Sequence, residues 1–142
     1  MADSPEIPEG FAPIAKPSSF GQLLGPVYER EDDDGSFVRA IMVEEKHTNL
    51  GGVVHGGVLM SFVDVIMGTT SYRHAGRSGA SIRIVSDFVA PARIGDWLEG
   101  RGEVVKATRS VVFARGLLTV EGRTILTATG NYKLRGEPRF DR

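Results

Sequence analysis

The sequence predicts an α+β fold in which a curved antiparallel β-sheet wraps around one long central helix. Residues 57–74 are apolar on nearly every side of a helix, a turn-centred pair of extended runs precedes them, and four strand-like runs follow. A chain of 142 residues that is 41% hydrophobic and 25% charged fits one domain with a single core. Such a two-layer arrangement must cover both faces of its helix.

The first 17 residues form a proline-rich segment. Prolines at positions 5, 8, 13 and 17 disfavour a helix or a central strand. We therefore expect residues 1–17 to be an extended arm and residues 18–142 to form the domain.

A short helix and a hairpin are expected next. Ser18 or Ser19 can cap a helix that runs through Leu24, because a serine hydroxyl accepts hydrogen bonds from the first helical N–H groups. The Asp-Asp-Gly sequence at 33–35 then predicts a turn between two extended runs. A glycine-rich loop follows the hairpin.

The segment from Gly57 to about His74 predicts one long buried helix. Its apolar side chains are Val58, Leu59, Met60, Phe62, Val63, Val65, Ile66 and Met67. They leave no wide polar face, which is typical of a buried helix. The segment is too often interrupted by polar residues to span a membrane.

Asp64 is the only formal charge between Gly51 and Tyr72. Burying an ionised carboxylate without partners costs several kcal/mol, so proteins pair it or raise its pKa. One interpretation is a structural aspartate that accepts hydrogen bonds from a neighbouring turn or lies in a subunit contact. The other is a catalytic carboxylate in a cleft.

The second half of the chain predicts an antiparallel sheet. The stretch ASIRIVSDFVA alternates with the period of a strand, and Pro91 ends it. Three further runs, Trp97–Lys106, Ser110–Glu121 and Arg123–Leu134, are separated by short turns and imply an antiparallel meander.

The loop before the long helix carries groups suited to binding a carbonyl oxygen. Gly56 and Gly57 stand where the helix begins, and glycine leaves backbone N–H groups open to a ligand. The positive end of the helix dipole adds to this, so the site could hold an oxyanion. His55 and Asn49 supply further hydrogen-bonding groups, although each of these residues alone is ordinary in a turn.

Composition excludes several classes of function. A net charge of −1 gives no general reason to expect a nucleic-acid or anionic-membrane partner. The chain has no cysteine, and its three histidines lack the spacing of helical metal ligands, so no metal site is expected. The N-terminus lacks the features of a secretory signal, which favours a cytoplasmic protein.

The stretch NLGGVVHGGVLMSFVD resembles the signature of hotdog-fold acyl-CoA thioesterases of the phenylacetate-pathway (PaaI-like) type. The later stretch SIRIVSDFVAPARIGDWLEGRGEVV is similar to the strand pattern of that family. The resemblance extends from about Ser36 to Leu134. It implies a hotdog fold and hydrolysis of an acyl thioester, with no cofactor because coenzyme A is part of the substrate.

The resemblance also implies roles for individual residues. The N–H of Gly57 would polarise the thioester carbonyl, and Asp64 would be the nucleophile or the general base. Asn49 and His55 would orient the substrate or a water molecule. Ser81 would lie near Asp64.

Binding of the coenzyme A moiety is expected to involve backbone and basic groups. Gly56 is expected to contact the substrate. The basic side chains in or beside turns are Arg73, Arg77, Arg93, Lys106 and Arg109, of which we select Arg93 and Arg109 as the phosphate ligands.

The spacing of the site residues predicts a dimer. Nine positions from His55 to Asp64 correspond to roughly 13 Å of helix rise and about 2.5 turns, so the two side chains point in opposite directions. A two-fold axis can bring the loop of one subunit against the helix of another. The resemblance agrees, because hotdog thioesterases commonly form such dimers and often pair them, so we expect a homodimeric catalytic unit in a homotetramer.

Rival functions on the same fold make different demands. A non-catalytic acyl-CoA binding or sensing protein is the alternative, but a sensor would be expected to carry a DNA-binding helix-turn-helix and to lack the carboxylate. A purely structural protein has no need for Asp64 beside the glycine-rich loop. A hydratase would be expected to carry its Asp and His on a longer loop.

Overall fold

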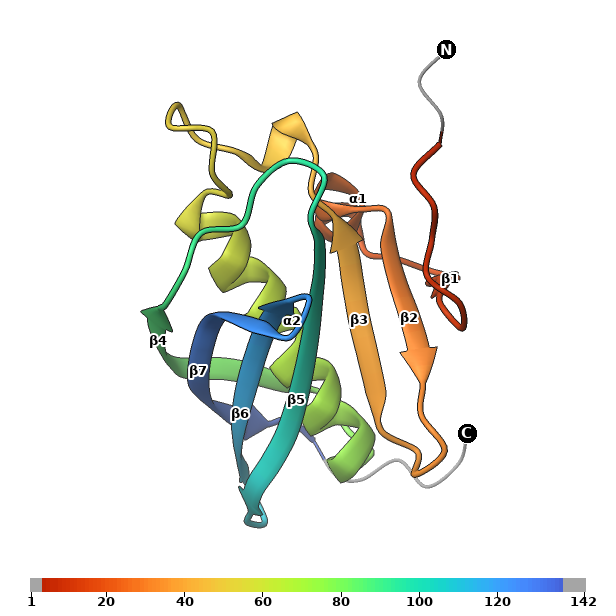
Figure 1. The fold of residues 1–142 in the computed structure, drawn as a ribbon. Helices are drawn as coiled ribbons and strands as arrows, with labels where there is room; N and C mark the ends of the chain where they lie inside the picture. Colours follow the sequence, from red (N-terminus) through yellow and green to blue (C-terminus); the bar gives the residue numbers. More distant parts are fainter. Residues whose placement is uncertain (1–3, 137–142) are drawn as a thin grey trace.

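The computed structural model describes residues 4–136 as a seven-stranded antiparallel sheet curved around one long helix (Figure 1). The sheet order is β1-β2-β3-β5-β6-β7-β4. The elements are β1 (Ala12–Pro13), α1 (Ser19–Leu24), β2 (Val27–Glu31), β3 (Phe37–Met42), the 3-10 helix η1 (Glu45–His47), α2 (Gly56–Ala75), β4 (Gly79–Phe88), β5 (Trp97–Ala107), β6 (Val111–Val120) and β7 (Arg123–Leu134). The predicted α+β architecture is confirmed.

Residues 4–17 of the proline-rich segment lie along the edge of the sheet. Its short strand β1 pairs with β2, where an edge position tolerates proline. Phe11 packs edge-on against Trp97, with 5.2 Å between the ring centroids. Residues 137–142 of the domain predicted from 18 to 142 lie outside the described residues.

The short helix and the hairpin are confirmed. The Ser18 hydroxyl accepts a hydrogen bond from the Gly21 N–H at 3.0 Å, which caps α1. Strands β2 and β3 pair antiparallel across residues 32–36, where the Asp34 carboxylate accepts the Ser36 N–H at 2.9 Å. This aspartate holds the turn that the sequence predicts.

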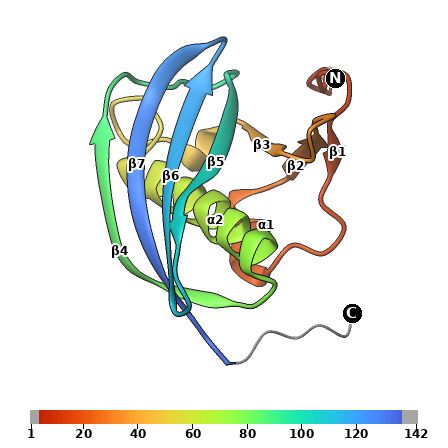
Figure 2. The same cartoon turned by 90° about the horizontal axis from the view of Figure 1, so that it is seen from below.

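Helix α2 lies in the hollow of the sheet (Figure 2), and its bounds exceed the predicted ones by one residue at each end. Its buried residues are Leu59, Phe62, Val63, Ile66, Met67 and Ser71. Val65 and Gly68, on the opposite side, are only half-buried. The expectation of burial on every side is therefore wrong for the single chain, because the sheet covers only one face of the helix. Among residues 4–136, no helix combines the length and apolarity of a membrane span.

Glycines let the helix approach the sheet closely. A Cβ atom on Gly116 of β6 would lie 2.6 Å from the Val63 Cγ2 and 3.0 Å from the Met67 Cγ. Both neighbours are fully buried in α2. The helix backbone can therefore sit nearer to the strands than ordinary side chains would allow.

The three runs after residue 96 form the predicted meander β5-β6-β7. Strand β4 does not extend it on the β5 side. It lies on the far edge beside β7, with Ser81 opposite Tyr132, because β3 already occupies the other edge of β5. Residues 89–96 cross between the two positions. The strand that follows α2 is thereby brought next to the last strand of the chain.

The close approach at Gly116 predicts a size limit. Gly116→Ala forces a methyl group against Val63 and should lower the free energy of unfolding by about 1–3 kcal/mol. Gly68→Ala is the matched control, since its Cβ would meet only the Tyr132 ring at 3.5 Å and alanine favours a helix. Urea unfolding at one protein concentration measures both. Equal loss of stability in the two variants would show that the packing against Val63 is not limiting.

Candidate active site

The carboxylate of Asp64 is held by a tyrosine from the last strand. The Tyr132 hydroxyl donates to the Asp64 Oδ1 at 2.9 Å and lies 3.2 Å from the backbone oxygen of Asp64. Asp64 is half-buried, whereas Tyr132 is only 3% exposed. The hydrogen bond fixes the side chain of Asp64 on the flank of α2 that faces β7.

The position of Tyr132 depends on a missing side chain on β7. Its ring lies 2.9 Å from the place of a Cβ on Gly130, whereas a Cβ on Gly68 of α2 would make an ordinary contact with the ring at 3.5 Å. Burial, followed by the charge of Asp64 and the hydrogen bond to it, raises the pKa of Tyr132 well above its ordinary value. The hydroxyl therefore remains a hydrogen-bond donor at neutral pH. We did not predict Tyr132 from the sequence, because its place opposite β4 depends on the long-range pairing of the strands.

Asp64 and Ser81 line one cavity of about 740 Å³. Ser81 lies on β4 directly opposite Tyr132, just before an irregularity in the register at residues 81–83. The other lining residues are Arg39, Val65, Gly68, Thr69, Tyr72, Arg73, Ser78, Gly79, Ala80, Tyr132 and Arg135. A carboxylate and a hydroxyl thus face the same open space.

The helix start is capped by a histidine. His55 is the N-cap of α2, and its Nδ1 accepts the N–H of Gly57 at 2.8 Å. The N–H that the family resemblance assigns to the thioester carbonyl therefore already has an acceptor in this conformation. The N–H of Gly56 is the first of the helix and has no acceptor within it.

Asn49 organises the loop before the helix. Its Oδ1 accepts the N–H of Gly51 at 2.9 Å and that of Val53 at 3.4 Å. This side chain is exposed and closes a turn, so in the single chain its oxygen serves the loop itself.

A buried histidine anchors the other end of the loop. His47 is 1% exposed, and its Nδ1 accepts the Glu44 N–H at 2.9 Å. Its Nε2 therefore carries the proton and donates to the Leu24 carbonyl at 2.7 Å. The His47 carbonyl accepts the N–H of His55 at 2.8 Å. No local sequence signal predicts this role of His47, which holds the backbone of the helix cap.

The loop and the carboxylate are separate within one chain. From Gly56 to Asp64 the helix rises about 12 Å. Neither Asn49, His55 nor the glycine pair lines the cavity that contains Asp64 and Ser81. The structure therefore places the predicted site residues in two groups.

Two of the basic candidates are engaged elsewhere. The Arg73 guanidinium pairs with Glu29 at 2.7 Å and stacks on Phe37, 4.2 Å from the ring centroid. Arg77 donates to the backbone carbonyls of Arg109 and Gly136.

The remaining basic candidates have exposed side chains at different places. Arg93 forms an isolated bridge with Val53, close to the start of α2. Lys106 lies on β5, and Arg109 lies in the turn after it, near the segment that follows the end of α2. Arg93 and Arg109 therefore lie toward opposite ends of a 20-residue helix, about 30 Å long.

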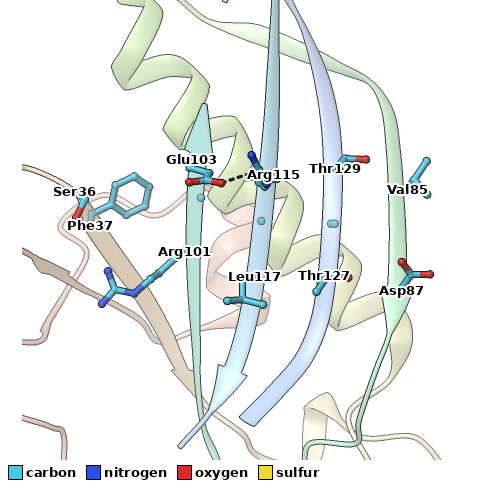
Figure 3. A pocket seen from close by; sticks show the side chains of 13 residues that line it. Ser36, Phe37, Val85, Asp87, Arg101, Glu103, Arg115, Leu117, Thr127 and Thr129 are labelled. Carbon is cyan, nitrogen blue, oxygen red and sulfur yellow. Dashed lines mark ion pairs between the residues drawn. The ribbon is translucent and has the colours of Figure 1, made fainter. Parts of the chain in front are cut away.

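A second cavity, of about 630 Å³, lies on the outer face of the sheet, away from α2 (Figure 3). Its lining includes Asp87 of β4 and the ion pair between Arg115 and Glu103, which are 2.6 Å apart. None of the predicted site residues lines it.

Comparisons with known proteins point to one family. Residues 51–127 match the model of the thioesterase superfamily. The chain is 35% identical over 130 residues to a Pseudomonas aeruginosa protein classed by name as an esterase, covering 90% of this chain and 97% of the relative. It is 27% identical over 120 residues to human acyl-coenzyme A thioesterase 13, covering 84% and 86%.

Solved structures share the fold. Zebrafish thioesterase superfamily member 2 superposes with a TM-score of 0.75 at 30% identity, covering 85% of this chain and 89% of that one. A thioesterase protein of Streptococcus pneumoniae, solved with coenzyme A, gives a TM-score of 0.73 at 24% identity, covering 80% and 91%.

The raised pKa of Tyr132 predicts a pH dependence of stability. Its ordinary value of about 10 applies to the unfolded chain, so its contribution is complete below pH 10 and is lost as the pH rises further. Above pH 10, the free energy of unfolding of the wild type should then fall more steeply than that of Tyr132→Phe, by up to about 1.4 kcal/mol per pH unit. Tyr72→Phe, at a tyrosine that is 52% exposed, is the control and should keep the wild-type slope. Urea unfolding at a series of alkaline pH values measures these slopes. Equal slopes for wild type and Tyr132→Phe would contradict the raised pKa of Tyr132.

Proposed function

The chain belongs to the thioesterase superfamily, and on this basis we propose that it hydrolyses acyl-coenzyme A thioesters with Asp64 as the reacting carboxylate. The observation that carries the proposal is the cavity shared by Asp64 and Ser81, in which Tyr132 orients the carboxylate. A half-buried, oriented carboxylate beside a hydroxyl suits attack on a carbonyl carbon or activation of water.

Coenzyme A as the leaving group is supported by the relatives. The human relative is named as an acyl-coenzyme A thioesterase, and the Streptococcus pneumoniae structure contains coenzyme A. The PaaI-like subtype rests on the sequence resemblance around His55 and Asp64. The reaction itself needs no metal or organic cofactor, because coenzyme A enters as part of the substrate.

The helix start supplies the donor for the carbonyl oxygen. Gly56 offers an N–H at the positive end of the helix dipole, where negative charge develops on that oxygen. The predicted donor, Gly57, can join it when the oxygen replaces the His55 Nδ1 as acceptor. We therefore assign the first hydrogen bond to Gly56 and the second to Gly57.

Two routes complete the hydrolysis. In the first, an Asp64 oxygen bonds to the carbonyl carbon, the carbon–sulfur bond breaks and coenzyme A leaves as a thiolate; water then hydrolyses the mixed anhydride to the free acid and the Asp64 carboxylate, and its released proton goes to the thiolate. In the second, Asp64 takes a proton from a water molecule whose oxygen bonds to the carbonyl carbon; the carbon–sulfur bond then breaks, and the departing coenzyme A thiolate takes up that proton. Ser81 can orient that water in either route, and Asn49 and His55 hold the loop that receives the oxygen.

The complete site requires a second copy of the chain. Gly56 and Asp64 of one chain are too far apart, but a two-fold axis can place the loop of one subunit over the Asp64 cavity of another. The edge strand β4 supports this, since among residues 4–136 its edge away from β7 pairs with no strand, and Ile82 and Val85 on it are 61% and 45% exposed. The catalytic unit is a homodimer, and two such dimers form a homotetramer.

Arg93 is the first candidate for the coenzyme A phosphates. It lies beside Val53 in the loop that leads into the helix start, where the leaving group must also be held. In the homodimer, Arg109 of the other subunit is the second candidate.

The catalytic role predicts a large effect of Asp64→Asn. Turnover should fall by at least about two orders of magnitude, the scale for loss of an acid-base or nucleophilic group. A panel of acyl-CoA thioesters assayed with a thiol reagent measures it, and circular dichroism checks the fold. Asp87→Asn on the outer face of the sheet is the matched control and should behave as wild type. A wild type that binds acyl-CoA without releasing thiol would favour the non-catalytic binding function instead.

The shared site predicts complementation between two inactive variants. Gly56→Pro removes the proposed donor while proline remains acceptable at the first helical position, and Gly56→Ala, which keeps the N–H, measures the smaller loss of activity that the added Cβ causes by itself. After complete subunit exchange with Asp64→Asn, half of the dimers are mixed and each has one intact site of two, so activity should recover to about a quarter of wild type. Native mass spectrometry confirms the exchange. Mixed dimers without activity would place each site within one chain.

A further inference from the structure

Phe88, the last residue of β4, lies against the start of α2. Three carbons of one ring edge, Cε1, Cζ and Cδ1, lie 3.2, 3.4 and 4.0 Å from the place of a Cβ on Gly56. Only a glycine lets the ring come this close without displacement. The aromatic ring is therefore packed beside the residue whose N–H begins the helix.

The ring is also open to the outside. Phe88 is 58% exposed, so a bound ligand could contact the side of the ring that does not touch Gly56. Phe88 lies opposite the buried Leu126 in the sheet, so its side chain lies on the face of the sheet that carries the helix. Its position is set by the sheet and not by a loose loop.

An aromatic edge beside an N–H donor changes the strength of that donor. Apolar atoms displace water, and a hydrogen bond to a developing negative charge is stronger where water is excluded. The edge of the ring also carries partial positive charge, which favours a nearby oxyanion.

On the basis of the proposed function, we infer that Phe88 is a positioning residue of the thioester site. Its ring covers the Gly56 N–H from one side and keeps water from it while the carbonyl oxygen is bound. Because this shielding matters most when charge develops on the oxygen, it acts on turnover more than on substrate binding. Gly56 and Phe88 thus form one unit, in which the absent side chain makes room for the ring.

Kinetics of ring variants test the inference. Phe88→Ala should lower kcat by about 10-fold with less than about a twofold change in KM, a smaller loss than removal of the donor itself. Phe88→Tyr keeps the ring and should restore kcat. Val89→Ala is the matched control, because Val89 is the adjacent residue and is 56% exposed. Thermal unfolding and the mass of the oligomer are measured for each variant.

A double-mutant cycle tests the contact itself. Gly56→Ala should displace the ring and lower kcat in the wild type, but it should have little further effect in the Phe88→Ala background. Additive losses, an unchanged kcat in Phe88→Ala, or a loss that follows dissociation of the oligomer would overturn the role of Phe88. If the wild type itself releases no thiol from acyl-CoA, the proposed function fails and the inference fails with it. Activity in the wild type with an inert Phe88 overturns the inference alone.

Discussion

The close contact between α2 and the sheet is the constraint on which the rest of the structure depends. It is possible only where strand residues such as Gly116 have no side chain. The same device makes room for Tyr132, whose ring lies 2.9 Å from the place of a Cβ on Gly130 of the sheet. If the helix stood further out, the tyrosine hydroxyl could not reach Asp64. Packing in the core therefore decides the geometry of the carboxylate.

The start of the helix is controlled by two histidines with different tasks. His47 is buried, neutral and saturated with hydrogen bonds, so it holds the loop in one conformation. His55 is exposed and lends its Nδ1 to the Gly57 N–H. A temporary acceptor of this kind satisfies a backbone donor at no loss of stability until a substrate oxygen takes its place. The loop thus combines a rigid anchor with an exchangeable cap.

The local elements could be predicted from the sequence, whereas the pairing between distant segments could not. The hairpin, the long helix and the meander follow from short-range periodicity and turn residues. The place of β4 beside β7 depends on which sheet edge remains open after β3 and β5 pair. Asp64 could be singled out as an isolated charge, but its partner Tyr132 lies 68 positions away. The sequence also does not predict that His55 caps the Gly57 N–H, because this hydrogen bond depends on the rotamer of the His55 side chain.

One rigid helix carries both the N–H groups at its start and the carboxylate in its middle. In the proposed homodimer these belong to different sites, so each α2 contributes the electrophilic half of one site and the nucleophilic half of the other. A tilt or slide of one helix would change both sites in the same movement, because 20 hydrogen-bonded residues transmit it without deformation. The two active sites are then linked mechanically, and a substitution that shifts α2 to change one site also changes the other.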